Sequence, residues 1–314
     1  GVLVVQPDAA KPQHSLQGAS FARSTKDQTA VHALADAAIA IVDNILNSEA
    51  VLGLSSIRLY DQYTFQHSVS TAVAGVVIGR NLGWQRQQLC DLATGCLMHD
   101  IGKIFIDREV LNKPGRLTED ETRIVQEHAK LGYETVRQIF GPGMLSNHVP
   151  YQHHERQDGS GYPRGLSGDN NIPNPWLRTG PDQILAMAQV ASVADVYDAL
   201  NSDRPYRPAV APDQLIKLLN DMSGTYLNQA LVERFLAIIS PFPTGSEVVL
   251  RGNADVNGCK GVVVRVNPRA HNHPVVRVLF DPYGGQLVPF ELDLTKCPDL
   301  HLESTVILPP GALS

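Results

Sequence analysis

Histidine and aspartate side chains recur through the first two thirds of the chain in a pattern that suits a metal centre. The most compact example is the pair His99-Asp100, which ends an apolar segment and is followed closely by Lys103. Six of the eleven histidines lie between positions 67 and 154. Imidazole and carboxylate groups are ligands of hydrolytic divalent metals, and one carboxylate can bridge two ions. The candidate metal-binding residues are His67, His99, Asp100, His128, His153, His154 and Asp195.

This set is too large for one structural zinc ion. Such an ion takes four ligands, usually with thiolates at close spacing, whereas these candidates are imidazoles and carboxylates spread over five segments. Their number indicates at least two metal ions. Two ions that share a carboxylate can hold a hydroxide for in-line attack and neutralise a phosphoryl oxygen, so the pattern favours phosphodiester hydrolysis.

Basic and aromatic side chains near these segments suit a phosphorylated substrate. Lys103 follows the His-Asp pair, and Arg204 and Arg207 supply guanidinium groups that bind phosphate oxygens well. Surface salt bridges are the alternative role for both arginines. The run 153–166 is rich in turn-forming residues and predicts a loop beside the candidate ligands. In it, Tyr162 either offers a flat face to a base or belongs to a simple surface turn.

Length and composition are those of an ordinary globular protein. The 314 residues are 43% hydrophobic and 18% charged, which suits one large domain and a small one. The net charge of −6 argues against binding of DNA or RNA polymers, so any phosphate binding is local. No apolar run approaches the ~20 residues that span a bilayer. The four cysteines have no CxxC spacing, so we expect reduced thiols in a cytoplasmic protein: Cys90, Cys96, Cys259 and Cys297.

Apolar periodicity predicts a mainly α-helical domain over residues 28–243. Residues 1–27 are expected to be a partly disordered lead-in or the remnant of an upstream domain. A capping box from Thr118 to Glu121 marks the start of the helix that carries His128. The expected helices lie at residues 28–47, 65–82, 85–98, 118 onward, 144–154, 184–200, 212–222 and 228–239. Small residues within the second of these indicate close helix packing.

Residues 244–314 predict a small antiparallel β barrel or sandwich, because short β-rich runs alternate with turn signals. We expect His271 and His273 to lie in a surface turn. The domain is expected to cover one face of the helical domain rather than to take part in catalysis. The expected strands lie at residues 248–251, 261–266, 274–280, 286–290 and 305–308.

Residues 30–240 resemble an HD-GYP domain, a subgroup of the HD-superfamily phosphohydrolases associated with cyclic di-GMP hydrolysis. The C-terminal β segment also resembles a tail found on some family members. The resemblance implies an HD-superfamily helical bundle. It rests on ordered motifs: Tyr63-Thr-Phe-Gln-His67-Ser, His99-Asp-Ile-Gly-Lys103, Leu111-Asn-Lys-Pro-Gly115, His128, the 153–166 run, Asp195-Val-Tyr-Asp198 and Asp203-Arg-Pro-Tyr-Arg207.

This resemblance also implies roles for individual residues. The seven candidates above would hold two divalent ions, most readily Fe or Mn, with Asp100 as a bridging and catalytic residue. Lys103 would be catalytic and, with Arg204 and Arg207, would hold phosphates, while Asp198 and Tyr162 would complete the substrate site. The loop Gly161-Tyr162-Pro163 is where a diguanylate cyclase (GGDEF) partner would dock.

Three features depart from the family pattern. Tyr63 stands where some members carry a glutamate associated with a third metal, which favours a two-metal site. Gln157 replaces a usual tryptophan, so base stacking or loop anchoring by that position is open. The segment 171–189 is about a dozen residues longer than the common pattern and is either a lid over the site or a solvent loop.

The sequence therefore predicts a cyclic di-GMP phosphodiesterase that produces linear pGpG, with slow or no further hydrolysis to GMP. A phosphodiesterase for a mixed cyclic dinucleotide, such as cyclic GMP-AMP, is one alternative. The other is a catalytically weak cyclic di-GMP sensor or a protein that docks on a diguanylate cyclase. The complete ligand set favours catalysis, because a binding module has less need of seven such residues.

Overall fold

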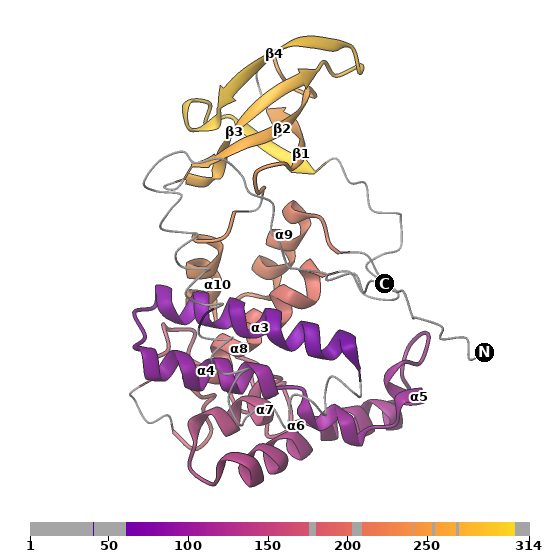
Figure 1. Ribbon diagram of the computed structural model, residues 1–314, viewed down its shortest axis with the longest axis vertical. Coiled ribbons are helices and arrows are strands. Elements are labelled where there is room, and N and C mark those ends of the chain that lie inside the picture. The colour runs from indigo at the N-terminus through magenta and orange to yellow at the C-terminus, as the bar shows by residue number, and fades with distance from the viewer. Residues whose placement is uncertain are drawn as a thin grey trace, which may run out of the picture.

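The structure, a computed structural model, describes residues 40, 61–175, 180–202, 209–240, 242–252, 255–267 and 270–304 of the chain. Helices form the N-terminal part of this described chain and a β-sheet forms its C-terminal part (Figure 1). The predicted fold class, a mainly α bundle followed by a small antiparallel β domain, is confirmed. The helix predicted over 28–47 lies outside the described residues, except for residue 40, which is helical.

The helical part follows the predicted order, with ends that differ by a few residues. Its elements are α3 (Gln62–Asn81), α4 (Arg86–Met98), the short helix η1 (Ile101–Phe105), α5 (Arg108–Leu111), α6 (Glu119–Phe140), η2 (Leu145–Asn147), α7 (His148–Gln152), α8 (Ala186–Asn201), α9 (Pro212–Met222) and α10 (Gln229–Leu236).

Helix α8 is the buried centre of the helical part, and every residue from Ala186 to Ala194 is buried. It packs against α3, which in turn packs on α4. Small residues allow this close approach: a Cβ atom added at Gly75 would lie 3.1 Å from Cys96 Sγ. The close packing predicted for residues 65–82 is confirmed. It brings together three helices that carry or precede candidate ligands.

A glycine after the His-Asp pair, Gly102, allows the short helix η1 to pack closely on α6. The short helix η1 begins directly after Asp100 and packs on α6, and a Cβ atom on Gly102 would overlap the backbone oxygen of His128. The predicted capping box is present. The backbone N–H of Glu121 donates to Thr118 Oγ1 at 3.2 Å, and the backbone N–H of Thr118 donates to Glu121 Oε2 at 2.7 Å. Helix α6 therefore starts as predicted and carries His128 past the His-Asp pair.

The prediction of one helix over residues 144–154 is wrong. The segment divides into η2 and the short helix α7, and His153 is the C-cap of α7. The amide of Asn147 donates to the backbone oxygen of Gly141 at 2.8 Å, which ties the first turn to the end of α6. The break leaves His153 and His154 at a helix end rather than inside a helix.

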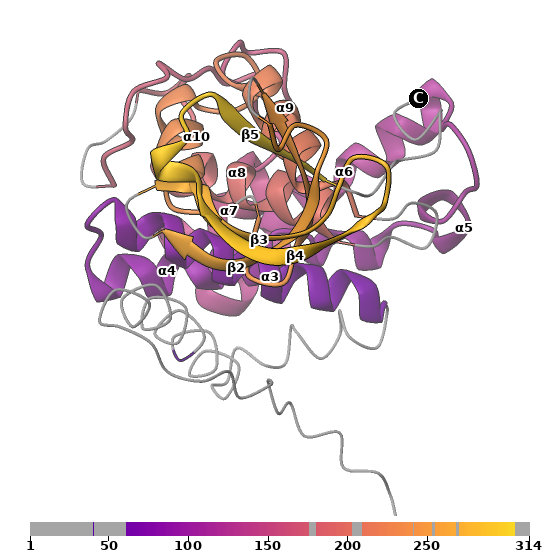
Figure 2. The ribbon, with the colours of Figure 1, turned by 90° about the horizontal axis from the view of Figure 1, so that it is seen from above.

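The C-terminal part is one five-stranded antiparallel sheet with strand order β4-β3-β2-β1-β5. Its strands are β1 (Glu247–Gly252), β2 (Lys260–Asn267), β3 (Ala270–Phe280), β4 (Gln286–Asp293) and β5 (Leu300–Ser304). Alternate residues of β1, such as Val248 and Leu250, enter a core with Val276 and Val278 of β3. The described strands thus form one sheet, curved in Figure 2, rather than a sandwich.

One prediction for this part needs correction, and another lies outside the described residues. His271 and His273 lie within β3 and not in a surface turn, because β3 starts before Pro274 and pairs again with β2 at Ala270, beyond a register irregularity. The last strand is β5, which pairs with β1, and the strand predicted at 305–308 lies outside the described residues.

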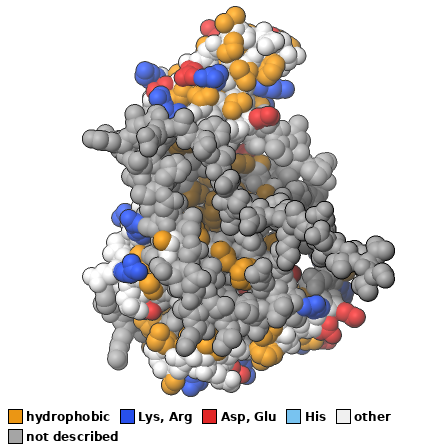
Figure 3. Space-filling view, viewed as in Figure 1, with side chains coloured by type: hydrophobic (Ala, Val, Ile, Leu, Met, Phe, Trp, Pro, Cys, Tyr) orange, Lys and Arg blue, Asp and Glu red, His pale blue; other side chains and the backbone are white. Residues whose placement is uncertain are grey.

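The sheet lies at the α9 and α10 end of the helical part, and β5 contacts α9. Helices α6 and α7 lie toward the opposite end (Figure 1). Figure 3 shows hydrophobic side chains on the surface of the end of the molecule that the sheet forms. Phe280, Val288 and Phe290, on β3 and β4, are exposed. Every described cluster of potential metal ligands comes from the helical part. The expectation that the sheet takes no part in catalysis stays a prediction.

Candidate metal centre

The structure brings all seven predicted metal ligands into one buried cluster. Potential donor atoms within each of three overlapping groups lie within 4.8 Å of one another. Three helices, and the segments that directly follow two others, supply the side chains. They are His67 on α3, His99 and Asp100 at the end of α4, His128 on α6, His153 and His154 at the end of α7, and Asp195 on α8.

Asp100 lies between two sets of histidines and turns one carboxylate oxygen toward each. Its Oδ1 lies 3.5 Å from Nε2 of His128 and 3.8 Å from Nε2 of His153. Its Oδ2 lies 3.3 Å from Nε2 of His99 and 4.0 Å from Nε2 of His67. A carboxylate with one oxygen toward each set has the geometry of a bridging ligand.

The group on the Oδ2 side also includes Asp195. Its Oδ1 lies 2.9 Å from Nε2 of His67 and 3.8 Å from Nε2 of His99. We name this set group 1. It offers two imidazole nitrogens and two carboxylate oxygens, which is a complete first coordination sphere for a four-coordinate ion. Its members are His67, His99, Asp100 and Asp195.

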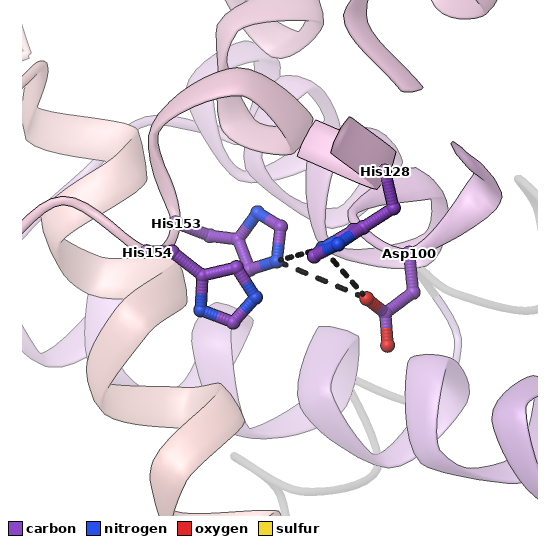
Figure 4. Close-up of side chains that lie close together, drawn as sticks. All are labelled: Asp100, His128, His153 and His154. Carbon is purple, nitrogen blue, oxygen red and sulfur yellow. Dashed lines mark hydrogen bonds and ion pairs between the residues drawn. The ribbon is translucent and has the colours of Figure 1, made fainter. Parts of the chain in front are cut away.

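The group on the Oδ1 side is formed by three imidazoles and the shared carboxylate. We name it group 2, and it comprises Asp100, His128, His153 and His154. Figure 4 shows the rings of His153 and His154 side by side, facing His128 and Asp100. The Nε2 atoms of His128 and His153 lie 3.5 Å apart. Each group therefore has four candidate ligands, and Asp100 belongs to both.

Hydrogen bonds behind the rings fix which nitrogen faces the cluster. The Nδ1 atoms of His99 and His128 lie 2.7 Å and 2.6 Å from the backbone oxygens of Cys96 and Val125. The Nδ1 of His153 lies 3.0 Å from the backbone oxygen of Pro150. Because a carbonyl oxygen only accepts, each Nδ1 carries the proton and each Nε2 presents a lone pair to the cluster.

His67 is oriented by a carboxylate instead. Its Nδ1 lies 2.6 Å from Oδ2 of Asp198, whose other oxygen accepts a hydrogen bond from Ser202 at 3.0 Å. A carboxylate behind a histidine ligand orients the ring and raises its basicity. Asp198 thus lies behind His67, and its described contacts place it in a supporting position rather than at a substrate surface.

Three of the candidate imidazoles are held in the neutral form that a metal ligand requires. Burial lowers the pKa of His154 to about 3 and holds the pKa of His128 and of His153 below the ordinary histidine value. These rings are neutral near pH 7 and can donate lone pairs. For His67, burial alone would lower the pKa, but the hydrogen bonds to Asp195 and Asp198 outweigh it and raise the pKa to about 9. His67 would have to lose this proton to bind a metal ion through Nε2.

Both cluster carboxylates are held in the charged form. Burial alone would raise the pKa of Asp100, but the positive charge of Lys103 outweighs burial and holds that pKa well below its usual range. The hydrogen bond from His67 likewise lowers the pKa of Asp195 against the effect of burial. Metal ligands must be deprotonated, and these two groups meet that requirement.

The cluster also contains polar atoms that the described protein leaves without hydrogen bonds. Nε2 of His99 and Oδ1 of Asp100 are buried and have no hydrogen-bond partner among the described residues. A buried polar atom without a partner is costly, and a divalent cation would satisfy both atoms. The donor set of imidazoles and carboxylates therefore fits two divalent metal ions.

Two predicted substrate residues lie at the edge of this cluster. The ammonium of Lys103, which is partly exposed, donates to Oδ2 of Asp100 at 2.6 Å. The ring of Tyr162 stacks on that of His154, with centroids 4.7 Å apart and an interplanar angle of 27°. Arg204 and Arg207 lie outside the described residues, so their predicted role stays a prediction. The segment 171–189 is described only in part, and its role as a lid or a solvent loop stays open.

Sequence reasoning did not identify Glu155 as part of the site. Its buried carboxylate accepts hydrogen bonds from the backbone N–H groups of Arg164 and Leu166, both at 2.8 Å. These bonds close the loop that carries Tyr162. The signal in the sequence was an acidic residue directly after the histidine doublet, at the start of a turn-rich run.

Tyr63 and Gln157 are the two departures that the structure locates. Tyr63 lies one turn before His67 on α3, as predicted. Gln157 is buried and is bonded to Gln189 by its amide at 3.2 Å, so it anchors the loop rather than offering a surface to a base.

Comparison with known proteins places this chain among HD-domain proteins. A family model described as an HD domain matches residues 42–231, more than half of the chain. A cyclic di-GMP phosphodiesterase of Pseudomonas aeruginosa is 31% identical over 240 residues, which are 76% of this chain and 53% of that protein. A 3'3'-cGAMP-specific phosphodiesterase of Vibrio cholerae is 34% identical over 166 residues, 53% of this chain and 33% of the relative.

The cyclic di-GMP phosphodiesterase response regulator RpfG of Xanthomonas campestris is 36% identical over 168 residues, 52% of this chain and 40% of the relative. The chain thus spans about half the length, or less, of these curated relatives. Among solved structures, an HDG"Y"P protein from Bdellovibrio bacteriovorus aligns with a TM-score of 0.44 at 18% identity, over 67% of this chain and 63% of that one.

The chain belongs to the HD domain family. The resemblance that its ordered motifs indicated is confirmed by relatives that are named cyclic di-GMP phosphodiesterases. None of the described helices is both long enough and apolar enough to cross a membrane.

Proposed function

We propose that this chain is a metal-dependent phosphodiesterase that opens cyclic di-GMP to linear pGpG. The position of Asp100 carries the proposal, because its two oxygens face two separate groups of imidazoles at 3.3 to 4.0 Å. The names of the relatives from Pseudomonas aeruginosa and Xanthomonas campestris support the substrate.

The site is proposed to hold two divalent ions, one at each group, with Asp100 as the bridge. Imidazole and carboxylate ligands suit Fe and Mn, although other divalent ions share this preference. Bound there, the two ions would lower the pKa of a water molecule and neutralise the phosphoryl oxygens of the bond that is cut. Asp198 and the backbone carbonyls behind the rings keep the ligand atoms aimed at the ions.

The remaining residues are proposed to place the dinucleotide. Lys103 lies beside Asp100, and its partly exposed ammonium can reach a phosphate oxygen at the edge of the cluster. Arg204 and Arg207 would bind further phosphate oxygens. Tyr162 stacks on His154 and would present its ring edge or hydroxyl to a base. These four side chains would bind and orient the dinucleotide, while the ions held by the ligand cluster would promote hydrolysis of the phosphodiester bond.

The proposed product is the linear dinucleotide. A phenol, whose ordinary pKa is about 10, is a poor ligand for a further hard cation compared with a carboxylate. Tyr63 therefore favours two ions rather than three. With two ions rather than three, the second hydrolysis to GMP would be slow or absent.

A mixed cyclic dinucleotide is the second candidate substrate. It is favoured by one observation, the similarity to a relative named as a 3'3'-cGAMP-specific phosphodiesterase. A role as a sensor, or docking of a GGDEF partner on the loop Gly161-Tyr162-Pro163, would use the same surface without turnover. We place the activity in the cytoplasm, since the four cysteines are free thiols.

The test is hydrolysis by purified protein loaded with Fe(II) or Mn(II). Cyclic di-GMP and 3'3'-cGAMP are supplied in parallel, and the products are separated by chromatography. The proposal expects metal-dependent formation of pGpG, with cyclic di-GMP the faster substrate. Faster turnover of 3'3'-cGAMP would favour the second candidate. Binding of cyclic di-GMP without turnover by the metal-loaded protein would show that the chain is a sensor.

A further inference from the structure

The loop of residues 155–171, here named the substrate loop because it carries Tyr162, is bonded along its length to the turn between α9 and α10. The backbone N–H of Asp158 donates to the oxygen of Thr225 at 3.0 Å. The side-chain amide of Asn170 donates to the backbone oxygen of Gly224 at 2.9 Å. The substrate loop is therefore held by a segment that contributes no metal ligand.

Asn228 lies at the centre of this attachment. Both the oxygen and the nitrogen of its side-chain amide form hydrogen bonds. As N-cap of α10, its Oδ1 accepts from the backbone N–H of Leu231 at 2.9 Å. Its Nδ2 donates to Oε1 of Gln189 at 2.7 Å and to the backbone oxygen of Asn171 at 2.8 Å. The side chain is buried. Among common cap residues an aspartate would accept as well, but it would have no proton to donate.

Gln189 carries the connection from Asn228 to the substrate loop. Its Nε2 donates to the backbone oxygen of Ile184 at 2.9 Å, which fixes the amide so that Oε1 is the acceptor. That Oε1 also receives the amide of Gln157 at 3.2 Å. The oxygen of Gln157 in turn accepts the backbone N–H of Asn170 at 3.3 Å. A chain of amides thus links α10, α8 and both ends of the loop.

The substrate loop determines where Tyr162 lies. The backbone N–H of Tyr162 donates to the oxygen of His154 at 3.3 Å, and its ring stacks on the ring of the same histidine. Glu155 closes the loop around this contact through its two backbone hydrogen bonds. Movement of the loop away from Gln157 and Asn228 would therefore move Tyr162 relative to the metal cluster.

We propose that Asn228 is a positioning residue for substrate: through Gln189 and Asn171 it holds the substrate loop, and with it Tyr162, against His154. The inference rests on the proposed function for its effect on substrate. Its effect on the loop can be measured independently of turnover.

The test variant is Asn228→Asp in the metal-loaded full chain. It keeps the acceptor that caps α10, removes both donated hydrogen bonds and sets a carboxylate oxygen against two acceptors. We expect KM for cyclic di-GMP to rise about tenfold, with kcat changed by less than about threefold and metal content unchanged. Asn228→Ser also keeps a cap acceptor but buries no charge, and it serves if the aspartate variant does not fold.

Asn147→Asp is the matched control. Asn147 is also buried and donates its amide to a backbone oxygen, that of Gly141, but this hydrogen bond does not involve the substrate loop. We expect it to lower Tm without raising KM. In a Tyr162→Ala background, Asn228→Asp should raise KM no further, because both changes act on the same contact.

Hydrogen exchange gives the readout that does not depend on activity. In Asn228→Asp, amides of residues 155–171 should exchange about tenfold faster, while those of α3 and α4 should not change. Unchanged exchange in the substrate loop, an unchanged KM, or a KM effect that multiplies that of Tyr162→Ala would each overturn the proposal. Failure of the parent protein to hydrolyse any cyclic dinucleotide would overturn the proposed function instead, and the exchange result would still decide whether Asn228 holds the loop.

Discussion

The ring of Tyr63 lies parallel to the imidazole of His67, with centroids 6.3 Å apart and an interplanar angle of 1°. The two residues are one turn apart on α3 and therefore share a helix face. Nε2 of the same imidazole faces Asp195 and Asp100, so position 63 lies next to the metal cluster but contributes a phenol where a carboxylate would be a better ligand.

Tyr63→Glu is expected to raise the metal content from two ions per chain toward three. A carboxylate is a far better ligand for a hard divalent ion than a neutral phenol. Metal content is measured on protein that has been loaded and then freed of excess ion. Tyr63→Phe, which keeps the ring and adds no ligand, is the control and should retain two ions. An unchanged count in Tyr63→Glu would show that Tyr63 does not limit the number of metals.

Asp198→Asn is expected to weaken metal binding about tenfold while leaving the helical fold intact, because it removes the charge behind His67 without removing a ligand. Competition with a chelator measures the affinity. Asp120→Asn changes an exposed carboxylate on α6 and should have no effect. Equal affinities of the two variants would contradict a supporting role for Asp198.

Gly102→Ala is expected to destabilise the protein by about 2–4 kcal/mol, since the added methyl group would overlap the backbone oxygen of His128. Chemical denaturation of the parent protein and of each variant gives the change in unfolding free energy. At Gly180 an added Cβ would meet nothing closer than 3.7 Å, so Gly180→Ala should be nearly neutral. A neutral Gly102→Ala would show that η1 does not depend on this close approach to α6.

Arg204→Ala and Arg207→Ala are expected to weaken nucleotide binding and turnover without lowering metal content. Each charge-assisted hydrogen bond to phosphate contributes roughly 1.5–3 kcal/mol. Calorimetric binding of cyclic di-GMP to the metal-loaded variants measures the loss. Parent-like affinity in both variants would assign the arginines to surface salt bridges.

The metal ligands could be predicted because their residue types are rare inside helical cores and their motifs are local. His99-Asp100 and His153-His154 are recognisable as pairs, and the capping box before His128 marks its helix directly in the sequence. The bridging position of Asp100 depends on how α3, α6 and α7 cross, which no local pattern contains.

Other features depend on contacts between distant segments. The burial of Gln157 follows from Gln189 and Asn228, which lie 32 and 71 positions further along the chain. The start of β3 before Pro274 likewise depends on pairing with β2 across an irregular register. Neither the burial of Gln157 nor the start of β3 has a periodic signal in the sequence, so these two features could not be assigned in advance.

The central claim is that Asp100 joins two metal ions at one hydrolytic site. The most direct measurement is the number of metal ions per chain and the rate of pGpG formation in the parent and in Asp100→Ala, made on the same preparations, with circular dichroism as the check on folding. The account predicts two ions and metal-dependent hydrolysis for the parent. For the variant it predicts loss of bound metal and a rate lower by more than about a hundredfold, with the helical signal retained. Near-normal turnover by a folded, metal-replete Asp100→Ala protein would contradict it.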